Sequence, residues 1–261
     1  MKPPFFVVGC VRSGTTLLRN LLRNHPNLWC SEETQYYRWG DAFGMPGFMN
    51  QVGRSPLMKR HRQIDGVDEE RFQELLALAR SRKDLLERFA NEYLRVKGAP
   101  DGRWFDKSPQ NVYGIPLLMH DFPGAKFVHI VRNPLNVVAS LIIGKVIAAP
   151  NVVAAANYWR EAVAIVNTCK PMLGDALHEF RYEDLVADPQ GETARLVAFL
   201  GEDPSLLEFT HDVHGEKDQH RATLTDADRE ALLEICGEWT EFYGYDLGVE
   251  AVGDVVRLES A

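Results

Sequence analysis

The sequence predicts an α/β fold of the P-loop type, in which helices cover both faces of a central parallel sheet in three layers. Two apolar segments, 5–8 and 126–131, have the length and composition of buried strands, and a turn and a helical pattern follow each of them. Strands that alternate with helices favour a parallel sheet. The chain has 261 residues, of which 45% are hydrophobic, and this is sufficient for one domain over 1–261 with its own core.

The first expected strand leads into a turn bounded by glycines, and apolar residues then recur at helical spacing over 15–22. A strand, a glycine loop and a helix N-terminus together present free backbone N–H groups to an anion. Gly9 and Gly14 are spaced as in the phosphate loop G-x-x-x-x-G-K-[ST]. Thr15 replaces the lysine of that pattern, however, and the basic residue of this loop is Arg12. The loop therefore predicts an anion site unlike that of nucleoside triphosphatases.

The strand at 126–131 ends in Arg132, where a nucleoside triphosphatase has an aspartate that helps to hold magnesium. Asn133 and Pro134 suit the N-cap and the first position of the next helix, which carries Ser140. In an open parallel sheet, ligands bind at the carboxyl ends of the strands. The two arginines, one in each motif, therefore predict a site for a nucleotide with anionic groups at two separate places.

The remaining elements are assigned from apolar spacing and turn residues. The expected strands are 28–30, 104–106 and 177–182, and the expected helices are two over 67–96 and one each at 113–122, 151–173, 193–200 and 225–244. Glu32 and Glu33 follow the strand at 28–30, and adjacent carboxylates at a strand end indicate either a solvated pair or a catalytic group. Lys107 follows the strand at 104–106 and is interpreted either as a surface residue or as part of a site.

Residues 36–64 are rich in aromatic residues, glycine and methionine, but their periodicity is weak. They are interpreted either as an irregular packed loop or as a wall or lid of an acceptor pocket, since such pockets are mostly apolar. The basic run 59–62 is expected to be solvated, with contact to an anionic acceptor as the alternative. Together with the two helices over 67–96, this stretch predicts a helical insertion at about 36–100 on the acceptor side.

Two motifs resemble sulfotransferases that use 3′-phosphoadenosine 5′-phosphosulfate (PAPS). VGCVRSGTTLL resembles their 5′-phosphosulfate loop, and FVHIVRNPLNVVASL resembles their 3′-phosphate segment. The stretch 5–35, which includes NHPNLWCSEETQ, is similar to the tyrosylprotein sulfotransferase branch in particular. The resemblance covers about the first 37 residues together with 104–109 and 126–141, and most of the remaining chain matches no family pattern.

The resemblance implies that PAPS is the co-substrate, that adenosine 3′,5′-bisphosphate (PAP) is the product, and that no metal ion is needed. Carried over to this sequence, the nucleotide-binding residues are Arg12, Ser13, Gly14, Thr15, Thr16, Arg132 and Ser140, with Lys217 and Arg221 in a basic loop before the last helix. Arg12 and Lys107 would also stabilise the charge on the leaving group. Glu33 falls on the catalytic base of the tyrosylprotein branch and would accept the proton of the acceptor.

The resemblance leaves the acceptor open between a hydroxyl of a small molecule, such as a phenol, and a hydroxyl of a peptide. Gln35 stands where the tyrosylprotein branch has an arginine, and this difference weakens the case for acidic peptides. Two other functions fit the same loop. One is a P-loop kinase or nucleotide hydrolase, which the absence of the loop lysine disfavours, and the other is a non-catalytic nucleotide-binding protein.

Composition narrows the possible partners and location. The net charge of −8 argues against a general binder of nucleic acid or of anionic membranes. Four widely spaced cysteines indicate neither a zinc site nor a disulfide framework, and His211, His214 and His220 lack a matching carboxylate pattern for a metal. The start of the sequence has neither a signal-peptide pattern nor a membrane span, so a cytoplasmic protein is expected.

Overall fold

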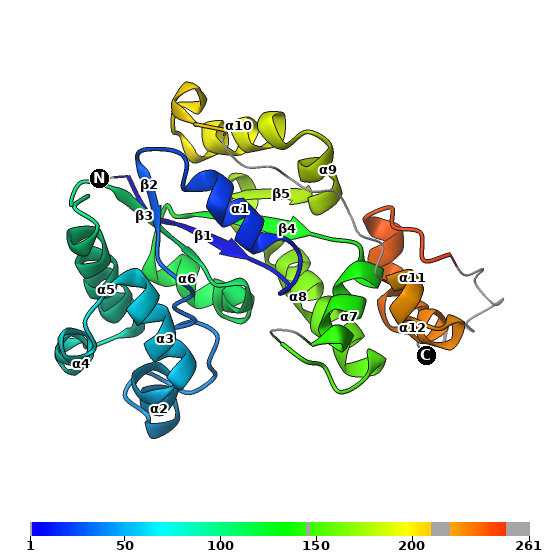
Figure 1. Ribbon diagram of the computed structural model, residues 1–261, viewed down its shortest axis with the longest axis horizontal. Helices are drawn as coiled ribbons and strands as arrows, with labels where there is room; N and C mark the ends of the chain where they lie inside the picture. Colours follow the sequence, from blue (N-terminus) through cyan, green and yellow to red (C-terminus); the bar gives the residue numbers. More distant parts are fainter. Residues whose placement is uncertain (1, 145–146, 210–219, 249–261) are drawn as a thin grey trace. The chain divides into compact units, whose positions relative to one another are not determined.

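The computed structural model describes residues 2–144, 147–209 and 220–248 (Figure 1). The chain forms two compact units, of which the first comprises Met1–Arg132 and Glu161–Lys217 and the second comprises Asn133–Arg160 and Asp218–Ala261. No helix in the described ranges is both long enough and apolar enough to cross a membrane. The single domain expected from the sequence stays a prediction.

A parallel sheet of five strands is the centre of the first unit. The strands are β1 (Phe5–Val8), β2 (Leu28–Cys30), β3 (Arg103–Lys107), β4 (Lys126–Val131) and β5 (Leu177–Arg181). Their order is β2-β3-β1-β4-β5, and every neighbouring pair is parallel. The loops that follow β1 to β4 therefore leave the sheet at one edge, and β1 lies between β3, which ends at Lys107, and β4, which Arg132 directly follows.

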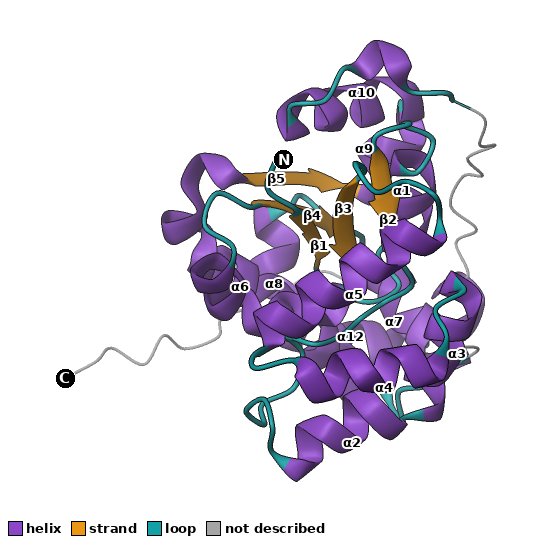
Figure 2. Ribbon diagram, turned by 90° about the vertical axis from the view of Figure 1, so that its left-hand side faces the viewer, coloured by secondary structure: helices purple, strands orange, loops and turns teal. Residues whose placement is uncertain are grey.

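Helices pack on both faces of this sheet because Phe5 and Phe6 point to opposite sides, as successive strand residues must. On one face, Phe5 and Val7 pack with apolar side chains of α1 (Thr15–Leu22), α9 (Tyr182–Ala187) and α10 (Pro189–Leu200). On the other face, Phe6 contacts Phe122, which follows α6 (Ile115–Asp121). Figure 2 shows the strands with helices on both sides. The predicted three-layer α/β fold is confirmed.

The insertion between β2 and β3 is helical. Its helices are α2 (Pro46–Arg54), α3 (Pro56–Asp65), α4 (Glu69–Leu78) and α5 (Arg82–Val96), and α4 and α5 are the two helices expected over 67–96. The interpretation of 36–64 as an irregular loop is wrong over α2 and α3, each of which starts with a proline at its first turn. The periodicity of α3 is weak because its buried face consists of Met58, Arg62 and Asp65, two of which are charged.

In the part of the chain that the structure describes, the regular elements of the second unit are all helices. They are α7 (Pro134–Ile143), the first part of α8 (Val152–Leu173), α11 (His220–Thr223) and α12 (Asp226–Phe242). Asn133 caps α7 as expected, with its side chain accepting from the N–H of Leu135 at 2.9 Å. Short 3-10 helices in the first unit complete the list at Pro109–Gly114, Gly174–Ala176 and Pro204–Leu206.

Candidate functional site

The glycine loop between β1 and α1 has an unusual backbone. Gly9 and Gly14 have φ values of 140° and 92°, and Arg12 between them has φ 70°. A non-glycine residue in this region is uncommon and persists only where its surroundings hold it. Because the first N–H groups of a helix have no partner within the helix, those of Thr15 and Thr16 at the start of α1 are available to an anion.

Ser13 gives a direct test of whether the loop fits an anionic group. Its hydroxyl is 0% exposed, and no residue in the described part of the chain forms a hydrogen bond with it. A buried polar group without a partner costs about 1–3 kcal/mol. A phosphate or phosphosulfate oxygen in the loop would supply the missing partner, so the loop fits the 5′ end of the expected nucleotide.

The loop meets the ends of β4 and β5 at Tyr182. The guanidinium of Arg132 lies over the ring of Tyr182, 4.3 Å from its centroid, and Arg132 Nη1 donates to the carbonyl oxygen of Arg12 at 3.0 Å. The ring also lies against Gly14, where a Cβ atom would come within 2.3 Å of Tyr182 Cδ2. The structure thus brings together the arginines of the two motifs.

Replacing Gly14 with alanine should both strain the loop and displace Tyr182. We expect the free energy of unfolding to fall by about 1–3 kcal/mol, since φ 92° is unfavourable for alanine, and we expect PAP affinity to fall as well. Urea unfolding and titration calorimetry measure the two effects. Gly201→Ala is the matched control, because Gly201 has φ 80° but open space around its Cβ position. Equal PAP affinity in both variants would contradict a role of this contact in binding.

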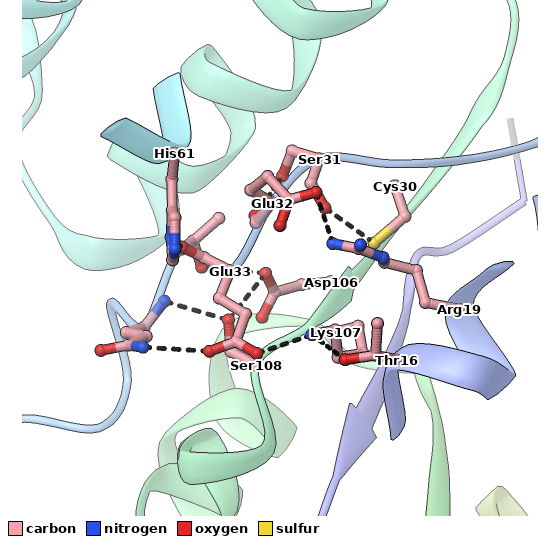
Figure 3. A network of polar contacts seen from close by, with 12 residues as sticks. Thr16, Arg19, Cys30, Ser31, Glu32, Glu33, His61, Asp106, Lys107 and Ser108 are labelled. Carbon is pink, nitrogen blue, oxygen red and sulfur yellow. Dashed lines mark hydrogen bonds and ion pairs between the residues drawn. The ribbon is translucent and has the colours of Figure 1, made fainter. Parts of the chain in front are cut away.

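Glu33 and Lys107 form an ion pair at the carboxyl ends of β2 and β3. Lys107 Nζ donates to Glu33 Oε1 at 2.6 Å and lies 3.4 Å from Thr16 Oγ1 on α1 (Figure 3). The lysine side chain is 2% exposed and that of the glutamate 22% exposed. Gln35 Nε2 donates to the other carboxylate oxygen of Glu33 at 3.0 Å. The predicted base, the predicted leaving-group lysine and the glycine-loop helix therefore meet in one place.

Glu32 has different surroundings from its neighbour. Its carboxylate pairs with Arg19 of α1 at 2.7 Å, and its N–H donates to Asp65 of α3 at 2.9 Å. Burial alone would raise the pKa of Glu32, but the hydrogen bond and the charge of Arg19 outweigh it and hold the pKa below its usual value. Glu32 thus anchors the segment, whereas the carboxylate of Glu33 faces Lys107.

Several contacts of the base segment were not expected from the sequence. His61 of α3 shares a hydrogen bond of 2.9 Å with the carbonyl oxygen of Glu33.

The expectation of a solvated run over 59–62 is wrong for Arg62, which is buried and donates to Glu69 at 2.9 Å. Tyr36 and Tyr37 are also buried, and the interpretation of this stretch as the wall of an acceptor pocket stays a prediction. A hydrophobic pattern could not reveal contacts that depend on polar side chains.

The remaining predicted nucleotide ligands, Ser140, Lys217 and Arg221, lie outside the part of the first unit that the structure describes. Ser140 on α7 and Arg221 on α11 both belong to the second unit, where His220 and Asn136 join these helices through a hydrogen bond of 2.9 Å. Their roles toward the nucleotide stay predictions. Lys217, His211 and His214 lie outside the described residues. Within the described ranges, no group of three or more histidine, cysteine, aspartate or glutamate side chains could hold a metal ion.

Comparisons with known proteins identify relatives of this sequence. The model of the Sulfotransferase family matches residues 3–205. Protein-tyrosine sulfotransferase 1 of Danio rerio is 27% identical over 202 residues, which cover 76% of this chain and 53% of that protein. The omega-hydroxy-beta-dihydromenaquinone-9 sulfotransferase Stf3 of Mycobacterium tuberculosis is 31% identical over 158 residues, which cover 54% of this chain and 40% of that protein. The chain thus spans about half the length of such curated relatives, or less.

Solved structures share the fold. The sulfotransferase domain of the Synechococcus PCC 7002 olefin synthase superposes with a TM-score of 0.70 at 23% identity, covering 94% of this chain and 97% of that domain. A mouse sulfotransferase complexed with PAP superposes with a TM-score of 0.52 at 12% identity, covering 91% of this chain and 84% of that chain. At these identities, the likeness concerns the fold.

Proposed function

Because this chain belongs to the sulfotransferase family, we propose that it transfers a sulfuryl group from PAPS to a hydroxyl group of an acceptor. The observation that carries the proposal is the 2.6 Å contact between Glu33 and Lys107 beside Thr16 of the glycine-loop helix. A carboxylate that can take a proton, an ammonium that can stabilise negative charge and a loop that binds an anion are the parts that group transfer requires.

PAPS would supply the activated sulfuryl group. The backbone of the glycine loop and the hydroxyls of Ser13, Thr15 and Thr16 would hold its 5′-phosphosulfate, in keeping with the buried, unpartnered hydroxyl of Ser13. Arg132 would bind the 3′-phosphate, since a guanidinium donates two parallel hydrogen bonds to such a group. Ser140, Lys217 and Arg221 are proposed as further ligands of the nucleotide.

In the proposed reaction, one charged residue removes a proton and two others stabilise negative charge. The acceptor hydroxyl would attack the sulfur in line, and Glu33 would take its proton as the new S–O bond forms. The S–O bond to the 5′-phosphate would break, and PAP would leave. Lys107 and Arg12 would stabilise the negative charge that develops on the leaving oxygen. The ammonium of Lys107 is held in place by its contacts to Glu33 and Thr16, so its side chain needs to move little when the negative charge develops.

The surroundings of Gln35 favour a neutral small-molecule acceptor over an acidic peptide. Its side-chain amide nitrogen donates to Glu33, and its side-chain oxygen Oε1 accepts from Arg38 Nη1 at 3.2 Å. The residue is 4% exposed, so its amide is engaged inside the protein and adds no charge for an acidic acceptor. The matched relatives include both kinds of enzyme, since one is named for protein tyrosine and another for a menaquinone derivative.

Labelled PAPS and a panel of acceptors test the proposal directly. We expect transfer of label to neutral alcohols or phenols, and weaker transfer to an acidic peptide that contains tyrosine. Two outcomes would contradict the proposal. Magnesium-dependent hydrolysis of ATP without sulfuryl transfer would indicate a P-loop kinase or hydrolase, and PAP binding without transfer to any acceptor would indicate a non-catalytic nucleotide-binding protein.

Arg132→Ala should weaken the binding of PAP while sparing nucleotides that lack a 3′-phosphate. We expect a loss of roughly 10–10²-fold, since hydrogen bonds to charged groups contribute about 1.5–3 kcal/mol. Calorimetry with PAP and with adenosine 5′-phosphosulfate measures the difference. Arg181→Ala is the control, because Arg181 ends the neighbouring strand β5 and pairs with Asp184 at 2.7 Å. Equal losses for the two nucleotides would remove Arg132 from the 3′-phosphate site.

A further inference from the structure

A buried carboxylate, Asp106, directly precedes Lys107 at the end of β3. It is 2% exposed. Burial raises the pKa of its carboxyl to about 6, although hydrogen bonds from Thr34 and Ser108 oppose this shift. A carboxylate in such surroundings is costly unless hydrogen bonds satisfy its oxygens. The hydrogen-bond donors around Asp106 therefore offset the cost of burying its carboxylate at this position.

Side chains from both segments of the site supply these donors. Thr34 Oγ1 and Ser108 Oγ donate to Asp106 Oδ1 at 3.0 and 3.1 Å. Asn111 Nδ2 donates to Asp106 Oδ2 at 2.8 Å. Thr34 directly follows Glu33, whereas Ser108 directly follows Lys107, and Figure 3 shows Asp106 beside Glu33 and Ser108. One carboxylate thus joins the residue after the base to the residue after the lysine.

The same donors also hold the backbone beyond Thr34. Ser108 Oγ accepts the N–H of Gln35 at 3.0 Å, and Asn111 Oδ1 accepts the N–H of Tyr37 at 3.1 Å. Gln35 has φ 55°, a conformation that is unfavourable for a non-glycine residue and needs support from its surroundings. From this position its side chain reaches Glu33 Oε2. The network around Asp106 therefore supports both the backbone and the second side-chain partner of the base.

We propose that Asp106 is a positioning residue, whose carboxylate sets the contact between Glu33 and Lys107 by fixing the segment 34–37 against the end of β3. The inference rests on the proposed function, in which Glu33 and Lys107 act on the two sides of the transferred group. Asp106 acts through these two residues, and its side chain is enclosed by Thr34, Ser108 and Asn111.

Asp106→Asn tests the proposal with little change of volume. An amide replaces one acceptor oxygen by a donor, so at least one of the three donors loses its acceptor. We expect kcat to fall by roughly 10–10²-fold, the scale of a misplacement of about 1 Å, while the acceptor KM and the PAP affinity change little. A second variant, Thr34→Val, removes one donor and keeps the carboxylate, and Thr34→Ser restores the hydroxyl. We expect Thr34→Val to lower kcat and Thr34→Ser to recover it.

A double variant separates positioning from a general loss of stability. If Asp106 acts by setting the contact between Glu33 and Lys107, then Asp106→Asn should lower kcat less in the Glu33→Gln background than in the parent, because coupled residues are not additive. Glu202→Gln is the matched control, since Glu202 is a buried carboxylate that pairs with Arg103 at the opposite end of β3. It should lower the melting temperature without lowering kcat.

Crystal structures of the variants provide a readout that does not depend on activity. We expect the contact between Glu33 Oε1 and Lys107 Nζ to lengthen in Asp106→Asn and Thr34→Val and to persist in Glu202→Gln. An unchanged contact, or multiplicative losses of kcat in the double variant, would overturn the inference. If the parent protein transfers no sulfuryl group but the contact lengthens, the proposed function fails while the positioning role of Asp106 stands.

Discussion

Replacing Glu33 with glutamine should lower turnover by roughly 10²–10⁴-fold, the range typical of a positioned general base. Glutamine keeps the size of the side chain and a hydrogen bond to Lys107, but it cannot take a proton from the acceptor. PAP affinity should therefore remain nearly unchanged, because the nucleotide contacts of the glycine loop are not altered. Initial rates with labelled PAPS and calorimetry with PAP measure both quantities.

The control for this prediction is the neighbouring carboxylate. Glu32→Gln weakens the ion pair with Arg19 and should lower the melting temperature, yet kcat should stay within a few-fold of the parent because Glu32 does not contact Lys107. If Glu33→Gln retained full turnover, or if Glu32→Gln lost as much, Glu33 would not be the base.

Replacing Lys107 with methionine should lower kcat by roughly 10²–10³-fold, the scale observed when a group that stabilises transition-state charge is removed. Methionine fills a similar volume in a position that is 2% exposed, so the packing changes little. The loss should appear in kcat more than in the affinity for PAP, because the charge that Lys107 stabilises develops during transfer. Steady-state kinetics and PAP titration distinguish the two.

Lys126→Met is the matched control for Lys107→Met. Lys126 is the first residue of strand β4 in the same sheet, and its ammonium donates to the carbonyl oxygen of Phe199, so its loss should affect stability at the opposite edge of the sheet from Lys107. We expect kcat to remain close to that of the parent. A Lys107→Met variant with unchanged kcat and an increased KM for PAPS would show that the lysine only binds the donor.

The sequence was sufficient to predict the parts of the fold that repeat simple patterns. The apolar strands before the glycine loop and before Arg132 were predicted as members of one parallel sheet, and β1 and β4 are parallel strands of that sheet. The cap at Asn133 and the break between α4 and α5 were likewise visible, because short-range hydrogen bonds and apolar spacing determine them.

The contacts that the sequence did not predict depend on buried polar groups. Helix α3 was not predicted because Arg62 and Asp65 occupy positions where an apolar residue would have revealed the helical period. In the sequence, Asp106 is indistinguishable from a solvent-exposed charge at the end of a strand. Its role depends on three side-chain donors that only the fold brings together. The left-handed backbone conformation of Gln35 could not be predicted from the sequence either, because glycine or asparagine usually marks that conformation.

The central place of β1 in the sheet has a consequence for exchange with solvent. Its amides are covered by β3 and β4, so the strand that carries the nucleotide loop should open only when the whole unit unfolds. Helices α2 and α3 are short and are attached through polar anchors such as Arg62 and His61, so their amides should exchange earlier. The strand before the glycine loop and the two helices of the insertion should therefore differ in local stability.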